Sequence, residues 1–235
     1  GGWRRGAPRK ESISPAHAPT AMPRDLDTPP PERLRIAGPA GALAVTWELP
    51  AGEPRGLVLH LHPHTVHGGT RQNNVVRHGA LGSLTAGCGA LRIDFRGARD
   101  SEGAYDEGRG EVDDAEAAFR WLQQRHPGLP VFIWGFSFGA RVGLDLGIRL
   151  QRETAGYLGV AWPTRTYPWP ASETWLTPCA FIHGTQDEYF DARAMEQARR
   201  HTQQLTLVEG ADHFFTGRLA VVREWTTEAL NGWLA

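Results

Sequence analysis

The feature that most constrains this chain is the alternation, from residue 33 on, of short apolar runs with segments of helical periodicity. Apolar runs of about four to eight residues between turn-forming residues are typical of buried strands, and apolar residues spaced three and four apart are typical of amphipathic helices. Strands that alternate with helices predict an α/β fold with a mostly parallel central sheet and helices on both faces. In such a sheet, functional sites lie at the carboxyl ends of the strands.

The expected strands cover residues 34–37, 43–49, 56–61, 90–95, 130–134, 157–161, 179–183 and 204–208, and the expected helices cover 73–85, 112–125, 139–152, 192–200 and 219–234. The first two strands form a hairpin around 38–41. Residues 1–31 hold seven of the seventeen prolines and show no hydrophobic periodicity, so we expect a proline-rich N-terminal tail. Residues 32–235 are expected to form one domain.

A serine motif lies between one of these strands and the helix that follows it. Gly135-Phe136-Ser137-Phe138-Gly139 comes directly after the apolar run 130–134. A serine on such a sharp turn needs small neighbours, because the backbones approach closely there. Its hydroxyl projects at a helix N-terminus, where the dipole and free N–H groups favour the negative charge of acyl transfer. The context predicts Ser137 as a nucleophile; the alternative is an ordinary turn with a capping serine.

A serine nucleophile needs a base, and the base needs an acid to orient it. Asp187 lies three residues after the glycine that ends the run 179–183, and His213 lies in the loop after 204–208. The order Ser137, Asp187, His213 is the one expected when a sheet of this type carries a catalytic triad. Rival carboxylates are Glu188, Asp191 and Asp212, of which Asp212 is read as a turn residue. A rival base, His183, lies inside an apparent strand and is expected to be a buried, hydrogen-bonded core histidine.

The segment 60–69 holds four histidines in eight residues, His60, His62, His64 and His67. Alternate residues of a strand share a face, so His60, His62 and His64 could point together toward a metal. No Cys, Asp or Glu stands at ligand spacing beside them, and we expect no metal and no cofactor. The segment leaves the strand expected beside the serine strand. We therefore predict that the backbone N–H groups of Phe138 and His64 form an oxyanion hole.

Charge and cysteine content exclude several classes of protein. The 25 Lys and Arg residues against 26 Asp and Glu give no electrostatic case for binding nucleic acid or an anionic membrane. Two cysteines are too few for a disulfide framework or a Cys-based zinc site. No apolar run approaches the roughly 18 residues that a membrane span needs. We expect a cytoplasmic protein with a small-molecule partner, and leave homodimerisation open.

Taken together, these motifs resemble the α/β-hydrolase superfamily over residues 33–235. His62-Pro63-His64-x-x-x-Gly68-Gly69-x-x-x-Asn73 is similar to the HPHP-x-x-GG-x-x-x-N signature of small bacterial α/β-hydrolases of dienelactone-hydrolase-like size, with Thr65 in place of the second proline and one residue added. The run 94–103 resembles the FRG-x-G-x-S-x-G run of that group, with Arg99 in place of a glycine. The resemblance implies an α/β-hydrolase fold. Arg96 and Ser101 are expected to fix the loop beside the site.

About 17 residues, 162–178, separate two expected strands, which is too few for a helical lid domain. Aromatic residues in and around this loop and the triad positions predict an apolar substrate pocket, formed by Phe136, Trp162, Phe190 and Phe214. The expected function is a serine hydrolase of carboxylesterase type, acting on a small to medium apolar acyl or aryl ester or thioester through an acyl-enzyme. An amidase or perhydrolase would use the same residues, and a non-catalytic binding or scaffold protein is the alternative from another class.

Overall fold

The computed structural model describes residues 28–169, 178–198 and 204–235. Its centre is an eight-stranded sheet in the order β1-β2-β4-β3-β5-β6-β7-β8. The strands are β1 (Glu32–Gly38), β2 (Gly41–Glu48), β3 (Gly56–Leu61), β4 (Cys88–Ile93), β5 (Val131–Phe136), β6 (Gly156–Val160), β7 (Cys179–Gly184) and β8 (Gln204–Val208). β1 and β2 form the predicted antiparallel hairpin and β2 pairs antiparallel with β4, whereas all strands from β3 to β8 run parallel.

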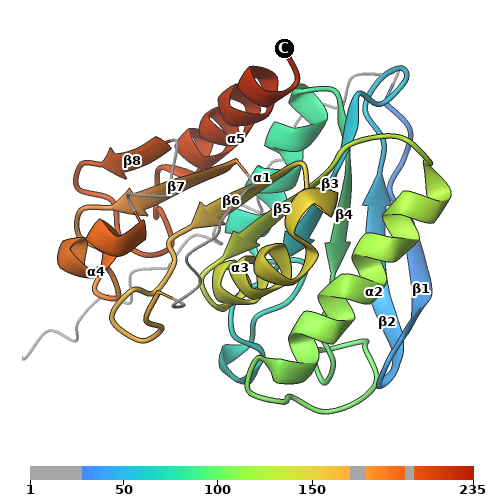
Figure 1. The fold of residues 1–235 in the computed structure, drawn as a ribbon, viewed down its shortest axis with the longest axis horizontal. Coiled ribbons are helices and arrows are strands. Elements are labelled where there is room, and N and C mark those ends of the chain that lie inside the picture. Colours follow the sequence, from blue (N-terminus) through green and yellow to red (C-terminus); the bar gives the residue numbers. More distant parts are fainter. Residues whose placement is uncertain (1–27, 170–177, 199–203) are drawn as a thin grey trace, which may run out of the picture.

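Helices cover the sheet on both faces (Figure 1). They are α1 (Asn74–Thr85), α2 (Arg109–Arg125), α3 (Phe138–Leu150), α4 (Ala192–Ala198) and α5 (Leu219–Trp233), with short 3-10 turns η1 (Thr65–His67) and η2 (Gln151–Glu153). α2 and α3 lie on one face, while α1 and α5 pack together on the other. The predicted alternation of strands and helices is confirmed.

Each inner strand is buried on both sides, as the apolar runs predicted. In β3, Leu57, Leu59 and Leu61 pack into the core under α2 and α3, whereas Val58 faces the core under α1 and α5. All four side chains are fully buried. Burying one such side chain contributes about 1.5–3 kcal/mol, so the two cores fix the sheet on which the site is built.

Several element boundaries differ from those expected. β4 ends at Ile93, two residues early, because the chain then turns to bond elsewhere: Phe95 N–H donates to His62 Nε2 at 3.0 Å. α2 begins at Arg109, three residues early, because the Glu111 carboxylate accepts bonds from the N–H groups of Asp106 and Gly108, both at 2.8 Å. The predicted end of α4 at 199–200 and residues 1–27 of the predicted tail lie outside the described residues.

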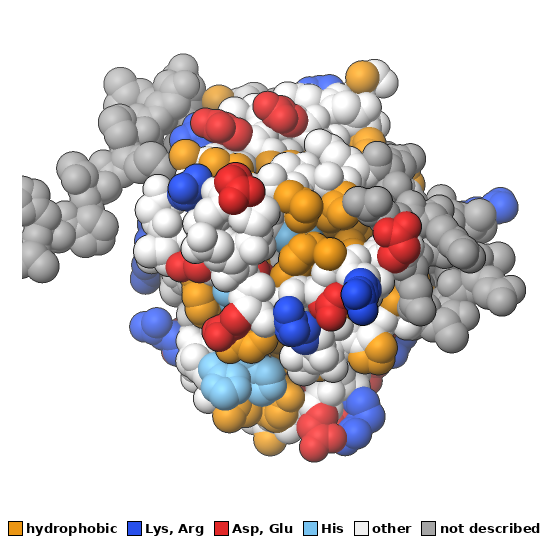
Figure 2. Space-filling model, turned by 90° about the vertical axis from the view of Figure 1, so that its left-hand side faces the viewer, with side chains coloured by type: hydrophobic (Ala, Val, Ile, Leu, Met, Phe, Trp, Pro, Cys, Tyr) orange, Lys and Arg blue, Asp and Glu red, His pale blue; other side chains and the backbone are white. Residues whose placement is uncertain are grey.

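The arrowheads of β7 and β8 point to the left-hand side of Figure 1, and Figure 2 views the molecule from that side. Hydrophobic side chains gather on this face, with histidines among and beside them. The loops after β3, β5, β7 and β8 leave the sheet at its carboxyl edge, so residues distant in sequence meet there. None of the helices in the described part of the chain combines the length and apolar character needed to cross a membrane.

Candidate active site

The turn between β5 and α3 holds Ser137 in a strained conformation. Its φ of 56° and ψ of −118° lie in a region that residues with a side chain rarely adopt. The flanking glycines are required by close approach: a Cβ on Gly135 would overlap the backbone of Gly139, and a Cβ on Gly139 would overlap the carbonyl of Leu61. Ser137 N–H donates to Val160 O at 2.9 Å, which ties the turn to the end of β6.

The structure brings Ser137, His213 and Asp187 together. The Ser137 hydroxyl lies 2.9 Å from His213 Nε2, and His213 Nδ1 lies 2.8 Å from Asp187 Oδ2. Asp187 has no exposed side-chain surface and His213 has 7%. An ionised carboxylate accepts only, so Nδ1 carries the proton and Nε2 is free to accept the serine proton. This arrangement can draw a proton from the hydroxyl.

Two of the three rival carboxylates, Asp191 and Asp212, bond backbone N–H groups. Asp212 Oδ1 accepts bonds from the N–H groups of Phe214 and Thr216, and these bonds lower its pKa. Asp191 Oδ1 accepts from Arg193 N–H at 2.8 Å and so caps α4. Asp187 itself is held by Tyr189, whose N–H donates to Asp187 Oδ1 at 2.8 Å. Of these acids, Asp187 is the one bonded to the His213 ring.

Three aromatic rings surround the His213 imidazole. Phe136 lies 5.3 Å away between ring centroids, Phe214 lies 5.2 Å away and Tyr189 lies 4.7 Å away. The last two meet the imidazole edge to face. These contacts fix the ring plane, so the Nε2 lone pair stays directed at Ser137. Tyr189 was not predicted; its position two residues after Asp187 is the one sequence signal for it.

An open cavity of about 240 Å³ lies above Ser137. Its lining includes Ser137, His213, Phe138 and His64. The N–H groups of Phe138 and His64 donate to no other described residue, so both are available to a ligand. The His64 ring accepts from Val66 N–H through Nδ1, and its Nε2 lies 2.9 Å from the Tyr105 hydroxyl. Burial and the neighbouring His67 lower the pKa of His64.

His60, His62 and His64 do not converge on one point, although the His64 and His67 rings lie 4.9 Å apart between centroids. The His60 ring is buried and bonded to Ser83, and burial lowers its pKa. His62 bonds Pro63 O at 2.6 Å and Phe95 N–H, and burial lowers its pKa to about 4. Across the described residues, no three His, Cys, Asp or Glu side chains are grouped as a metal site requires. The segment instead shapes the loop, where a Cβ on Gly69 would overlap the backbone of Pro63.

Three of the four predicted pocket residues do not line the cavity. Phe136 and Trp162 are fully buried; Phe136 packs behind His213, and Trp162 packs on Trp169 and Phe181. Phe190 stacks on His183 instead, with ring centroids 4.4 Å apart. Phe214 does line it and is 52% exposed. Position in the sequence does not tell a buried aromatic ring from one at the edge of the cavity. For this reason Tyr167, which lines the cavity from the loop after β6, was not predicted.

His183 is buried, as predicted, but the predicted hydrogen bonds are wrong. Neither ring nitrogen has a hydrogen-bond partner among the described residues. Burial lowers the pKa of His183 to about 3. A neutral imidazole always carries one N–H, so within the described part of the chain this buried ring keeps a donor without an acceptor.

Arg96 and Ser101 make the contacts of loop-fixing residues. The Arg96 guanidinium and backbone N–H both bond the buried Asp114 carboxylate, at 2.8–3.1 Å. Ser101 Oγ accepts from Ala44 N–H at 2.9 Å and donates to Asp94 O at 2.7 Å. These bonds join the loop after β4 to α2 and to β2.

A mostly parallel sheet that carries a serine at a strand–helix turn, hydrogen-bonded to a histidine after the last strand, is the architecture of α/β serine hydrolases. The chain belongs to the α/β-hydrolase superfamily, among its lidless serine hydrolases. No family model matches the chain.

Three known proteins that are similar over most of the chain support the assignment to this superfamily. An α/β serine hydrolase homologue from Coxiella burnetii is 31% identical with a TM-score of 0.78, over 84% of this chain and 96% of that one. XC6422 from Xanthomonas campestris, described as an α/β serine hydrolase without lid, is 29% identical with a TM-score of 0.77, over 86% and 94% of the two chains. The uncharacterised protein RP471 from Rickettsia prowazekii is 31% identical over 215 residues, 86% of this chain and 88% of that protein.

Part of the chain is also similar in sequence to an enzyme whose name states an activity. The lysophosphatidylserine lipase ABHD12 of Gallus gallus is 38% identical over 106 residues, which are 44% of this chain. The match spans only 26% of that lipase.

Proposed function

We propose that this protein is a carboxylesterase that cleaves small to medium apolar acyl or aryl esters and thioesters. Ser137 Oγ attacks the carbonyl carbon while His213 Nε2 takes the hydroxyl proton. Asp187 holds the His213 Nδ1–H and stabilises the imidazolium that forms. The N–H groups of Phe138 and His64 hold the oxyanion. The bond to the alcohol then breaks, the leaving group takes the proton from His213, and water releases the acyl group by the same route.

The observation that supports this most is the continuous pair of hydrogen bonds from Ser137 through His213 to Asp187 beside an open cavity. The cavity supports the choice of an apolar substrate. Among the described residues no Asp, Glu, Lys or Arg lines it, and aromatic rings of Phe138, Tyr167, Tyr189 and Phe214 do. The ABHD12 relative is named for hydrolysis of a lipid, which is compatible with ester chemistry here.

The test is turnover of p-nitrophenyl butanoate by the full chain and by Ser137→Ala. We expect the variant to lose at least about a thousandfold in kcat/KM, and EDTA to leave the wild-type rate unchanged. A folded wild-type protein without turnover would favour a binding or scaffold role. Turnover lost with chelator would favour a metal-dependent reaction. Amide and peracid assays on the same pair separate an amidase or perhydrolase from an esterase. A cytoplasmic location and a homodimer stay predictions.

A further inference from the structure

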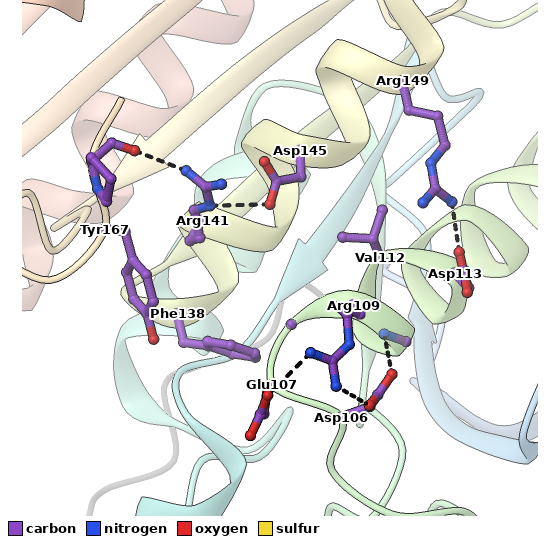
Figure 3. A pocket seen from close by; sticks show the side chains of 13 residues that line it. Asp106, Glu107, Arg109, Val112, Asp113, Phe138, Arg141, Asp145, Arg149 and Tyr167 are labelled. Carbon is purple, nitrogen blue, oxygen red and sulfur yellow. Dashed lines mark hydrogen bonds and ion pairs between the residues drawn. The ribbon is translucent and has the colours of Figure 1, made fainter. Parts of the chain in front are cut away.

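Figure 3 shows the side chains that line a second cavity, of about 640 Å³. It adjoins the cavity above Ser137. The two cavities share two wall residues, Phe138 and Tyr167. Thr166 lines the Ser137 cavity and Pro168 lines the second one. Tyr167 therefore forms the rim between them, and a ligand that crosses Tyr167 occupies both.

The volumes of the two cavities indicate that a substrate could occupy both. Ligand sites usually measure about 300–1,000 Å³. The Ser137 cavity, at about 240 Å³, falls below that range, and the second cavity falls within it. The Ser137 cavity alone suits the reacting ester and a short group on it. The second cavity, beyond Tyr167, offers room for the other end of a longer substrate.

The rim is fixed in place by hydrogen bonds. The N–H groups of Thr166 and Tyr167 donate to Pro163 O at 3.0 and 2.9 Å. Arg141 Nη1 donates to Pro168 O at 3.0 Å, which ties the rim to α3. The Phe138 and Tyr167 rings lie 6.4 Å apart between centroids. Both cavities are thus present together without rearrangement of the loop.

The walls of the two cavities differ in charge. Seven charged side chains line the second cavity, four acidic and three basic: Asp106, Glu107, Asp113, Asp145, Arg109, Arg141 and Arg149. Each arginine is already paired with an acid, as Figure 3 shows. An alkyl chain placed here would desolvate these ions without any compensating bond. The cavity therefore suits a polar end group.

The charge expected of that end group follows from the carboxylate oxygens that the ion pairs do not use. Asp145 accepts from Arg141 Nε at 3.0 Å through Oδ2, and its Oδ1 bonds to no described residue. Burial raises the pKa of Asp145, so a further positive charge beside this carboxylate would be stabilising. The acids outnumber the bases by one, and the Tyr167 ring offers a cation a π face.

We propose that the second cavity is a substrate subsite that binds the ammonium-bearing end of an ester whose carbonyl lies at Ser137. The inference rests on the proposed esterase function and adds a substrate class to it: esters with a cationic end several bonds from the reacting carbonyl. Asp145 is the specificity-determining carboxylate, and Tyr167 is the rim over which the chain passes.

The experiment compares p-nitrophenyl octanoate with its 8-ammonio and 8-carboxylate analogues, and measures kcat and KM for each. Wild type is expected to show a kcat/KM for the ammonio ester at least tenfold above that for the other two, mainly through KM. Asp145→Asn keeps a hydrogen bond to Arg141 and should reduce this preference about tenfold. Glu224→Gln removes the same charge from the exposed surface of α5 and should leave the preference unchanged.

Turnover of p-nitrophenyl butanoate by wild type separates the two claims. If butanoate is not hydrolysed, the proposed function itself fails. If butanoate is hydrolysed but the three octanoyl esters react alike, or the carboxylate analogue is preferred, the subsite is wrong. A preference for the ammonio ester that survives Asp145→Asn also overturns it.

Discussion

His213 Nε2 lies 2.9 Å from Ser137 Oγ, although 76 residues separate the two in the chain. The contact depends on the strained Ser137 backbone, which lifts the hydroxyl out of the sheet edge toward the loop after β8. Strain of this kind costs about 1–3 kcal/mol, and packing around the turn holds it in place. The geometry that aligns the nucleophile therefore lowers the stability of the fold.

Replacing Ser137 should reveal this cost. Ser137→Gly should raise the free energy of unfolding by about 1 kcal/mol, because glycine adopts a φ of 56° without steric strain. Ser137→Ala keeps a Cβ and should leave stability within about 0.5 kcal/mol of wild type. Urea denaturation of the three proteins measures the difference. A Gly variant that is less stable than the Ala variant, as at an ordinary unstrained position, would show that the turn is not strained.

Asp187→Asn should lower kcat by about 10³–10⁴ without unfolding the protein. The amide can donate to Nδ1 and so favours the tautomer whose Nε2–H cannot accept the serine proton. Tyr189 N–H can still bond the side-chain oxygen, so the loop should keep its place. Asp212→Asn, one residue from His213, is the matched control, and kcat should change little. Similar losses in both variants would contradict the assignment of Asp187.

Two neighbouring aspartates on α2 should differ sharply in their effect on stability. Asp114 is fully buried and bonds Arg96, so Asp114→Ala leaves a largely buried guanidinium unpaired and should cost about 3–5 kcal/mol. Asp113 pairs with Arg149 at the surface, where both side chains are about half exposed, and Asp113→Ala should cost less than about 1 kcal/mol. Thermal unfolding of both variants tests this. Comparable losses would mean that the Arg96 pair does not fix the loop.

His183 should make the fold sensitive to acid. The folded protein holds its pKa at about 3, so between pH 6.5 and 3 the unfolded chain binds the extra proton. The free energy of unfolding should therefore fall with pH in that window, by about 2 kcal/mol from pH 7 to 5 for this residue. His183→Phe should raise stability at pH 7 by about 1–2 kcal/mol, because it removes the unpaired polar atoms.

The same variant should also flatten the pH dependence. Urea midpoints at pH 7 and 5 for wild type and His183→Phe give the comparison. If the free energy of unfolding changes by the same amount between pH 7 and 5 in wild type and in His183→Phe, the folded protein binds a proton at His183 as readily as the unfolded chain does.

The sheet could be predicted from the sequence because burial of a strand on both faces requires a short run of apolar residues, and such runs are visible in the sequence. The run 56–61 can be buried on both faces only as an inner strand of a covered sheet. The sequence also predicted which side chains meet at the sheet edge, since parallel strands bring their carboxyl ends to one side. The serine motif and the order of the strands along the chain were enough to predict that Ser137, Asp187 and His213 meet.

The pocket was harder to predict, because burial of an aromatic ring is decided by long-range packing. Trp162 begins the aromatic loop and is core, whereas Tyr167, five residues on, lies at the rim. The second cavity was not predicted. The i,i+4 spacing of the Arg141–Asp145 ion pair is visible in the sequence, but the position of this pair in the same cavity wall as Tyr167 is not. Orientation of single side chains requires the packed structure.

The central claim is that Ser137 is an activated nucleophile. The most direct test is reaction of the folded full chain with a fluorophosphonate probe, followed by mass spectrometry of the labelled peptide. The account predicts a single adduct on Ser137, slowed by His213→Ala and absent in Ser137→Ala. A folded protein that takes up no label, or carries the label on another residue, would contradict it.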